Sequence, residues 1–350
     1  MKKTGVLLIN LGTPDSPSTS DVRRYLREFL NDPRVIDISP LRRFFLVNFI
    51  IVPTRAPKSA KLYKELWNMW NGESPLWSFG KKLKSLTQER FNGNNITVHF
   101  AMRYQNPSLE SVLREMENAH YDRIVILPLF PHNASASTGS AIEKAMKIIG
   151  KWWSMPEISI VESFFDHPKY VAAFVEKAKK HNVAEFDHVI FSYHGLPERQ
   201  IEKVHPNFKC ADCNCPNEYN KEQNLCYRNQ CYETSRLIAA QLNLPAEKYT
   251  VCFQSRLGKT PWLTPYSDHV VADLGKKGCK KILAFSPAFI ADCLETSYEI
   301  GVEYQHLFEK AGGTKVQLVE SLNDSKLWVD TVEELIRKRT ATDKKNCQRL

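Results

Sequence analysis

The stretch VIFSYHG, residues 189–195, decides the fold, because a similar stretch, VLLINLG, stands at residues 6–12. Both are apolar runs that end in a glycine, and neither alternates apolar with polar residues. Continuous apolar runs of this kind are typical of parallel strands that are covered on both faces. The repeat therefore predicts that the chain holds two copies of one α/β unit.

Further β-rich runs complete two sets of four, and helix-like segments between them favour βαβ crossovers. The third and fourth runs of the two sets also resemble each other and lie at nearly equal offsets. We therefore predict an α/β fold of two Rossmann-like domains, each with a four-stranded parallel sheet flanked by helices. The eight predicted strands are Gly5–Leu11, Ile96–Tyr104, Arg123–Phe130, Ile158–Phe164, His188–His194, Tyr249–Ser255, Lys281–Pro287 and Val316–Leu322.

The repeat also predicts the domain boundaries. The first domain is expected over residues 1–165 and the second over residues 166–325. A lip at about 41–63 belongs to the first domain, and a cysteine-rich insertion at about 205–231 belongs to the second. A closing helix over 326–340 and a flexible tail over 341–350 are expected to follow.

Composition favours a globular protein with a sizeable core, since 43% of the residues are hydrophobic and 25% are charged. The sequence start lacks the pattern of a signal peptide, and no apolar run approaches the roughly 20 residues of a spanning helix. We therefore expect a cytoplasmic protein. The run from Phe44 to Val52 lies beside Arg42 and Arg43, which suits either an apolar lip touching a membrane surface or a buried helix.

The net charge of +9 could attract nucleic acid, membrane or a small polyanion, so the charge does not choose between these partners. The basic residues do not gather beside the cysteines, as they would in a zinc ribbon that binds nucleic acid. We expect no nucleic-acid partner. A nucleotide-binding Rossmann enzyme is disfavoured as well, because the first strand continues into NLGTP (10–14) without a G-x-G-x-x-G pattern.

Two side chains stand where a ligand of such a fold would bind, outside the carboxyl ends of the strands. His194 closes the fifth strand, and imidazole can accept a proton or bind a metal at cellular pH. After the seventh strand, a helix starting near Ala291 would place Asp292, Glu295, Glu299 and Glu303 on one face. Such a stripe binds a hard cation or forms a solvated outer face, and both readings stay open.

Several motifs together resemble the ferrochelatases, the enzymes that insert ferrous iron into a porphyrin. FSYHGLP (191–197) resembles the family's histidine motif, and AFIADCLET (288–296) resembles its carboxylate motif. Further similar segments follow in family order from about residue 4 to 335: LINLGTP (8–14), GESPL (72–76), MRY (102–104), STGS (137–140) and FQSRLG (253–258).

The resemblance implies that His194 is the base or metal contact facing the porphyrin and that Glu295 shares its site. Glu299 and Glu303 would continue an acidic path for the metal. Cys293 stands where some relatives have a second histidine, so the approach of the metal differs here. The implied porphyrin contacts are Leu11, Arg103, Tyr104, Ser137, Thr138 and Trp262.

The implied reaction joins ferrous iron, as a substrate, to protoporphyrin IX to form protohaem. Coproporphyrin III is the alternative porphyrin, and a related chelatase loading cobalt or nickel is the alternative enzyme. The segment 41–63 also resembles the family's lip over the active site, against which stands ordinary domain packing by Phe44, Phe45 and Phe49.

Five cysteines fall within 22 residues of a polar, asparagine-rich stretch, and thiolates so close in a reducing compartment suit zinc or an iron–sulfur cluster. Some microbial ferrochelatases carry a 2Fe–2S cluster, and the position of this insertion is similar. We expect a 2Fe–2S cluster with a structural or redox-sensing role, with structural zinc as the alternative. The expected ligands are Cys210, Cys213, Cys215 and Cys226, with Cys231 in reserve.

Overall fold

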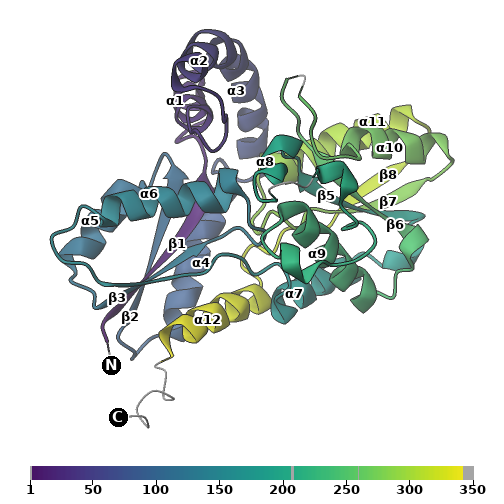
Figure 1. Cartoon of the computed structure of the whole chain (residues 1–350). Helices are drawn as coiled ribbons and strands as arrows, with labels where there is room; N and C mark the ends of the chain where they lie inside the picture. The colour runs from purple at the N-terminus through teal and green to yellow at the C-terminus, as the bar shows by residue number, and fades with distance from the viewer. Residues whose placement is uncertain (1, 206–208, 259, 342–350) are drawn as a thin grey trace.

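Eight strands form two parallel sheets of four, each flanked by helices, in the computed structural model, which describes residues 2–205, 209–258 and 260–341 (Figure 1). The predicted fold class and all eight predicted strands are confirmed. The strands are β1 Thr4–Gly12, β2 Ile96–Tyr104, β3 Arg123–Pro128, β4 Glu157–Ile160, β5 His188–His194, β6 Tyr249–Gln254, β7 Lys281–Phe285 and β8 Lys315–Leu318.

The two sheets have the same strand order, β2-β1-β3-β4 and β6-β5-β7-β8. The likeness extends to the glycine at the carboxyl end of the first strand of each half: Gly12 ends β1, and Gly195 follows β5. A Cβ on Gly12, whose φ is +123°, would lie 2.1 Å from the carbonyl oxygen of Tyr104. A Cβ on Gly195 would lie 2.9 Å from the carbonyl oxygen of Gln254. Glycine is therefore required where each central strand leaves its sheet beside a neighbouring backbone.

Several predicted strands ran too far at their carboxyl ends. The third stops at Pro128 instead of Phe130, and the fourth stops at Ile160 instead of Phe164. The apolar residues beyond these ends have other partners: Leu129 and Phe130 line a cavity, and Phe164 joins the core. An apolar run alone does not show where strand pairing stops.

The helices cover the sheets, and none of those described is both long and apolar enough to span a bilayer. The α-helices are α1 Thr19–Leu30, α2 Pro40–Phe45, α3 Val52–Met69, α4 Pro75–Arg90, α5 Leu109–Asn118, α6 Ser140–Ile149, α7 Pro168–Lys179, α8 Glu198–Glu202, α9 Tyr227–Gln241, α10 Ser267–Lys276, α11 Gln305–Lys310 and α12 Lys326–Thr340. Three π-helices are η1 Leu46–Ile51, η2 Ser135–Gly139 and η7 Leu294–Tyr304, and short 3₁₀ turns are η3 Val183–Glu185, η4 Cys210–Asp212, η5 Lys221–Gln223 and η6 Ala246–Lys248.

The lip forms a helical lobe of α1, α2, η1 and α3 that stands above the first sheet (Figure 1). One face of α3, with Val52, Ala56 and Tyr63, packs on α1. The turn from α2 into η1 leaves its apolar side chains outside this small core. We call these residues the exposed lip: Leu41, Phe44, Phe45, Phe49 and Ile50, each 51–68% exposed. Packing of Phe44, Phe45 and Phe49 into a domain core, the alternative from the sequence, is therefore wrong.

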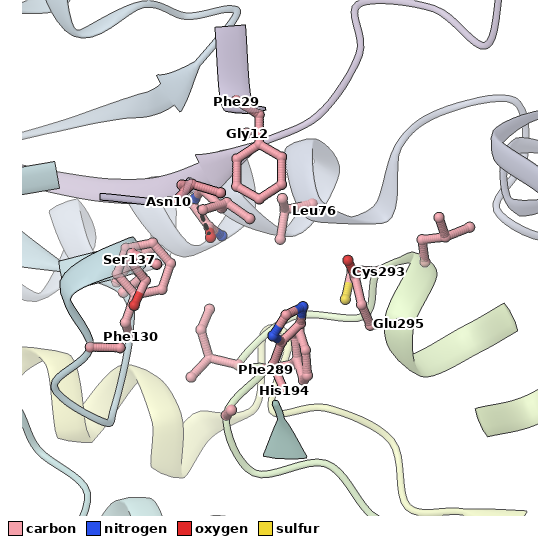
Figure 2. A pocket seen from close by; sticks show the side chains of 18 of the residues that line it. Asn10, Gly12, Phe29, Leu76, Phe130, Ser137, His194, Phe289, Cys293 and Glu295 are labelled. Atoms are coloured by element: carbon pink, nitrogen blue, oxygen red, sulfur yellow. Dashed lines mark hydrogen bonds between the residues drawn. The ribbon is translucent and has the colours of Figure 1, made fainter. Parts of the chain in front are cut away.

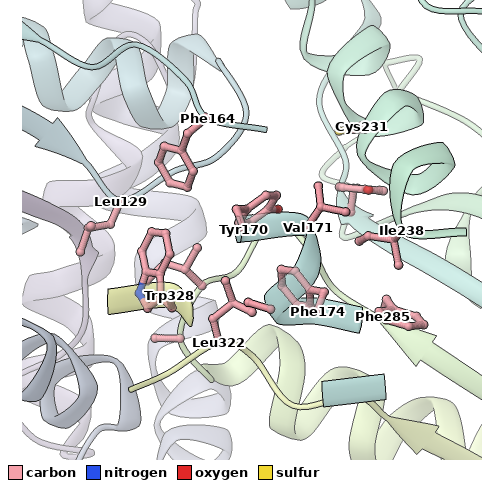
Figure 3. Packing of buried hydrophobic residues seen from close by; sticks show 14 of the residues in the cluster. Leu129, Phe164, Tyr170, Val171, Phe174, Cys231, Ile238, Phe285, Leu322 and Trp328 are labelled. Carbon is pink, nitrogen blue, oxygen red and sulfur yellow. The ribbon is translucent and has the colours of Figure 1, made fainter. Parts of the chain in front are cut away.

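Helix α12 covers the residues of the predicted closing helix, and it runs from the second half back to the first. Its Trp328 is fully buried and lies 5.4 Å, between ring centroids, from Phe164 of the first half, close to Tyr170 and Phe174 of α7 (Figure 3). At its end, Nη1 of Arg123 donates to the carbonyl oxygen of Thr340 (3.0 Å). The helix thus joins both halves through one continuous core.

We propose that the domain boundary lies between β4 and α7, near residue 165, with residues 166–325 forming the second domain. Residues 206–208 of the predicted insertion and residues 342–350 of the predicted tail lie outside the described residues.

Candidate active site

One cavity lies between the two halves, at the carboxyl ends of the strands. The empty space in it, including its open mouth, is about 1320 Å³. Its wall is mainly apolar. Of the residues predicted from the sequence, the wall includes Leu11, Ser137, His194, Trp262 and Glu295.

The predicted pair of His194 and Glu295 shares this cavity. Figure 2 shows His194 and Phe289 entering from one side, Asn10 and Phe29 lying across from them, and Glu295 at the edge beside Cys293. His194 is the last residue of β5, and Glu295 lies in the first turn of η7, which follows β7. The arrangement on which the predicted chemistry depends is present.

The imidazole of His194 has a defined orientation. Its Nδ1 lies 2.7 Å from the carbonyl oxygen of Gly195, and an acceptor there requires Nδ1 to carry the hydrogen. In the neutral ring, Nε2 then keeps its lone pair. The main chain is held as well, because the Tyr227 hydroxyl donates to the His194 carbonyl oxygen (2.8 Å). His194 therefore offers the cavity a proton acceptor or a metal ligand.

The acidic helix η7 begins later than the sequence predicted, with Cys293 as its N-cap. The prediction that Asp292 shares the carboxylate face is wrong. Asp292 is buried before the helix, where it accepts hydrogen bonds from Thr296 Oγ1 (3.0 Å) and Asn323 Nδ2 (2.7 Å). Because a π-helix has a wider turn than an α-helix, residues four apart stay nearly in line, which suits Glu295, Glu299 and Glu303.

Glu299 sits behind Glu295 and is held from β6. Its carboxylate accepts hydrogen bonds from Gln254 Nε2 (3.1 Å) and Ser255 Oγ (3.1 Å). Burial, and then the charge of Glu295, raises the pKa of Glu299 to about 8. Burial also raises the pKa of Glu303. The raised pKa lets Glu299 hold a proton near neutral pH.

Gln254 links this helix to the histidine. It pairs with His194 across β5 and β6, and its Nε2 also donates to the carbonyl oxygen of Glu295 (3.1 Å). Sequence reasoning did not single out Gln254, although the residue lies inside the motif FQSRLG. Its buried amide, beside the strand that carries His194, becomes informative only once the strand pairing is known.

Glu295 also faces phenol and thiol groups. Burial, and then the charge of Glu295, raises the pKa of the Cys293 thiol well above its ordinary value. Burial together with the Glu295 charge also raises the pKa of Tyr25 and Tyr63. These groups stay protonated, and the Cys293 thiol hydrogen-bonds the Glu295 carboxylate, whereas the hydroxyls of Tyr25 and Tyr63 hydrogen-bond each other. Neither tyrosine carried a sequence signal, because they come from the lobe helices α1 and α3.

Three predicted porphyrin contacts do not belong to the cavity wall: Arg103, Tyr104 and Thr138. Arg103 Nη2 lies 2.5 Å from Asp32 Oδ2, and the Tyr104 hydroxyl donates to the same oxygen (2.9 Å). The ring of Tyr104 packs on Phe29, which does line the cavity. Thr138 is buried behind the wall. These residues support the wall from behind.

The cysteine loop, residues 209–226, brings Cys210, Cys213, Cys215 and Cys226 around Arg228. The guanidinium of Arg228 acts electrostatically on all four thiols, and its Nη1 lies 3.8 Å from Cys210 Sγ. A hydrogen bond from the Cys215 thiol lowers the pKa of Cys213 to about 6. Burial raises the pKa of Cys210 to about 11.

The cysteine loop fits a thiolate-bound metal in its chemistry, although it is not preformed in its geometry. Within the described residues, no group of three or more His, Cys, Asp or Glu is arranged to hold a metal ion. Yet Arg228 forms no ion pair with a described carboxylate, and its buried Nε has no described hydrogen-bond partner. Thiolates would supply the missing negative charge. Cys231 lies apart, fully buried next to Tyr227.

Comparison with known structures identifies the fold. The structure of SirB from Bacillus subtilis with Fe3+ superposes with a TM-score of 0.55, at 12% identity, covering 97% of this chain and 96% of that one. The superposition shows that this chain shares the fold of that protein.

The family model of ferrochelatases matches residues 3–340. The ferrochelatase of Coxiella burnetii (strain Dugway 5J108-111) is 42% identical over 341 residues, covering 96% of this chain and 94% of that one. That of Legionella pneumophila (strain Lens) is 41% identical over 337 residues, covering 96% and 99%. The chain belongs to the ferrochelatase family and is a porphyrin metal chelatase, with ferrous iron as its metal substrate.

Proposed function

We propose that the protein inserts ferrous iron into protoporphyrin IX, forming protohaem, and that His194 and Glu295 carry the reaction. The observation that supports this most is the shared cavity, in which the free Nε2 of His194 and the Glu295 carboxylate stand in a mainly apolar wall. Coproporphyrin III is the alternative porphyrin.

In this proposal, His194 takes the pyrrole protons. Insertion releases two protons from the ring nitrogens for each Fe²⁺ that enters. A neutral imidazole with its lone pair on Nε2 accepts one proton at a time and passes it on before accepting the second. The apolar wall holds the ring and excludes water that would compete for the iron.

Glu295 replaces water on the entering iron in this proposal, because carboxylate oxygens are good ligands for a hydrated divalent ion. Glu299 and Glu303 extend the path along the face of η7. A proton held by Glu299, whose pKa is raised to about 8, limits the negative charge behind Glu295. The path therefore attracts iron without trapping it.

We further propose that Cys210, Cys213, Cys215 and Cys226 hold a 2Fe–2S cluster, with structural zinc as the alternative. The uncompensated Arg228 beside the four thiols supports this assignment. Such a centre would supply redox sensitivity or rigidity to the loop, away from the porphyrin. Purified protein that shows neither a visible charge-transfer band nor bound zinc would exclude both forms.

The exposed lip is proposed as a contact with the membrane surface. Phe44, Phe45 and Phe49 pack against one another with ring centroids 5.7–6.1 Å apart, and Arg42 and Arg43 lie beside them. An exposed aromatic cluster next to arginines suits the interface of an anionic bilayer. The lobe that carries the lip also lines the cavity with Tyr25, Phe29 and Tyr63, which would give a porphyrin a route from the lipid to the cavity.

The test is anaerobic incubation of purified protein with Fe²⁺ and either protoporphyrin IX or coproporphyrin III, followed by the absorbance of the product. His194→Ala and Glu295→Ala are each expected to lose at least about 100-fold in kcat with the fold intact by circular dichroism. Matched controls are His269→Ala and Glu309→Ala, which change exposed residues of the same half. Full turnover in either site variant would reject the site.

A further inference from the structure

Helix α9 touches both the cysteine loop and the porphyrin cavity. Its first two turns contain polar side chains that are completely buried, namely Asn229, Gln230 and Thr234. Buried polar groups are costly unless they are hydrogen-bonded, so their partners show what the helix holds in place. The partners fall into two sets.

The first set belongs to the cavity. The Tyr227 hydroxyl donates to the His194 carbonyl oxygen (2.8 Å), and the backbone N–H of Asn133 donates to Gln230 Oε1 (2.6 Å). His132 Nε2 lies 2.9 Å from Thr234 Oγ1. The Thr234 hydroxyl is already used as a donor to the Phe165 carbonyl oxygen, so Nε2 is the donor to it. His132 is part of the cavity wall.

The second set belongs to the cysteine loop. Gln230 Nε2 donates to the carbonyl oxygen of Asn224 (2.5 Å). Asn229 Nδ2 donates to the carbonyl oxygens of Asn220 (2.8 Å) and Gln223 (3.1 Å). Cys226, an expected metal ligand, is the N-cap residue of α9 and immediately precedes Tyr227.

The carboxamide of Gln230 therefore connects the two sites. Its oxygen accepts a hydrogen bond from the backbone of Asn133, next to His132 of the cavity wall, and its nitrogen donates to the backbone of Asn224 in the cysteine loop. If Asn224 moves away, the buried amide loses a partner, and the arrangement that also holds Asn133 is weakened. Loops with few apolar contacts open locally at low free energy. A loop whose four thiols are held by a metal is restrained against such opening.

We propose that Gln230 and Tyr227 are positioning residues that couple the metal state of the cysteine loop to the porphyrin cavity. A metal held by the thiols restrains Asn224 and the start of α9. Through Gln230 and Tyr227 it thereby also restrains the backbone at Asn133, beside the cavity wall, and the main chain of His194. This inference rests on the proposed function, because it takes the cavity as the porphyrin site and the loop as a metal site.

The experiment measures the Kd of protoporphyrin IX, without iron, by quenching of tryptophan fluorescence. Each protein is tested as isolated with its metal and after anaerobic removal of the metal by a chelator. In the wild type, removal is expected to weaken porphyrin binding about 10-fold, within the usual range of coupling between sites. In Gln230→Met, binding to the loaded protein is already weaker, and removal of the metal changes it less than 2-fold.

Matched controls are Gln241→Met and Tyr249→Phe. Gln241 is exposed at the end of the same helix, and Tyr249 lies at the amino end of β6, away from the cavity. Both controls are expected to keep the 10-fold response. Tyr227→Phe removes one hydroxyl, should fold even where Gln230→Met does not, and is expected to reduce the response to about 3-fold.

The visible band and metal content of Gln230→Met show whether its cysteine site still binds the metal. If it does, and removal of the metal no longer changes the Kd of porphyrin, the coupling has been lost. An unchanged response in Gln230→Met and Tyr227→Phe, or no response in the wild type, overturns the inference. Protein with neither iron nor zinc at the cysteines overturns both the metal site and the coupling. Failure of iron insertion into bound porphyrin would instead overturn the proposed function.

Discussion

The two halves of the molecule use the same framework for different chemistry. In the repeated strand ends, Leu11 of β1 corresponds to His194 of β5, and both line the cavity. After the third strand of each half comes a π-helix, which presents Ser137 in the first half and Glu295 in the second. In the proposed reaction, the first half thus supplies an inert wall at these two positions and the second half a reactive one, so the chemistry takes place on one face of a flat ligand between them.

The largest expected effect comes from exchanging the two central residues. In the double variant Leu11→His with His194→Leu, an imidazole still lines the cavity, but it enters from β1, away from Glu295 and Gln254. We expect kcat for iron insertion to fall at least about 100-fold, as for loss of a general base. Recovery of more than a tenth of wild-type turnover would show that either wall can carry the base.

The paired π-helices give the next test. Glu295→Gln keeps the shape but removes the charge that binds iron, and we expect kcat/KM for Fe²⁺ to fall about 30-fold or more. Ser137→Ala, at the corresponding place in the first half, should change kcat/KM less than about 3-fold. Equal losses in the two variants, measured in the same anaerobic assay, would contradict the division between an inert and a reactive wall.

The raised pKa of Glu299 gives a third test, which measures the stability of the protein instead of its turnover. Its pKa is raised from 4.5 to about 8, so the fold favours the neutral acid. This contribution to stability is complete below pH 4.5 and is lost as the pH rises through 8. Glu299→Gln stays neutral, so above pH 8 the variant should have a free energy of unfolding higher than the wild type by a few kcal/mol.

Urea unfolding at pH 5, 7 and 9 measures that difference. Because only the change between variant and wild type is compared, titration of other groups cancels. Glu89→Gln, an exposed position of the first half, is the control and should show a difference near zero at each pH. A variant that is less stable than the wild type at pH 9 would contradict the raised pKa.

The smallest effect on turnover is expected at the exposed lip, which the second half lacks among its described residues. Phe45→Ser with Phe49→Ser should weaken binding to vesicles that contain phosphatidylserine about 10-fold, while kcat in detergent changes less than 2-fold. Co-sedimentation measures the binding. Trp153→Ser removes an exposed aromatic residue from another surface and should leave vesicle binding unchanged.

Local rules located the strands, the position of His194 and the acidic stripe, and the resemblance to the ferrochelatases singled out the His194–Glu295 pair. Apolar runs mark buried strands, and side chains at their carboxyl ends reach a common edge. Sequence reasoning did not predict contacts that depend on how the side chains pack. A motif match cannot tell whether Arg103 touches a ligand or, as here, forms an ion pair with Asp32 behind the wall.

Other differences have equally definite causes. Asp292 is not on the carboxylate face because Cys293 is the N-cap and the helix begins after it. No spacing rule predicts which residue becomes the N-cap. The apolar pattern of the lip fits a buried helix and an exposed helix equally well. Only the position of α1 shows which of its apolar side chains are covered. Cysteine spacing predicts a metal but not its geometry, which depends on the backbone between the ligands.

The return of α12 to the first half has a mechanical consequence. Helix α12 packs on both halves and ends at Arg123, at the amino end of β3. It therefore restrains the movement of one half relative to the other. We expect these contacts to keep the gap between the two halves nearly constant during turnover. We therefore expect the protein to select its ligand by thickness, admitting flat macrocycles, while the lobe of α1–α3 supplies the movement needed for entry and release.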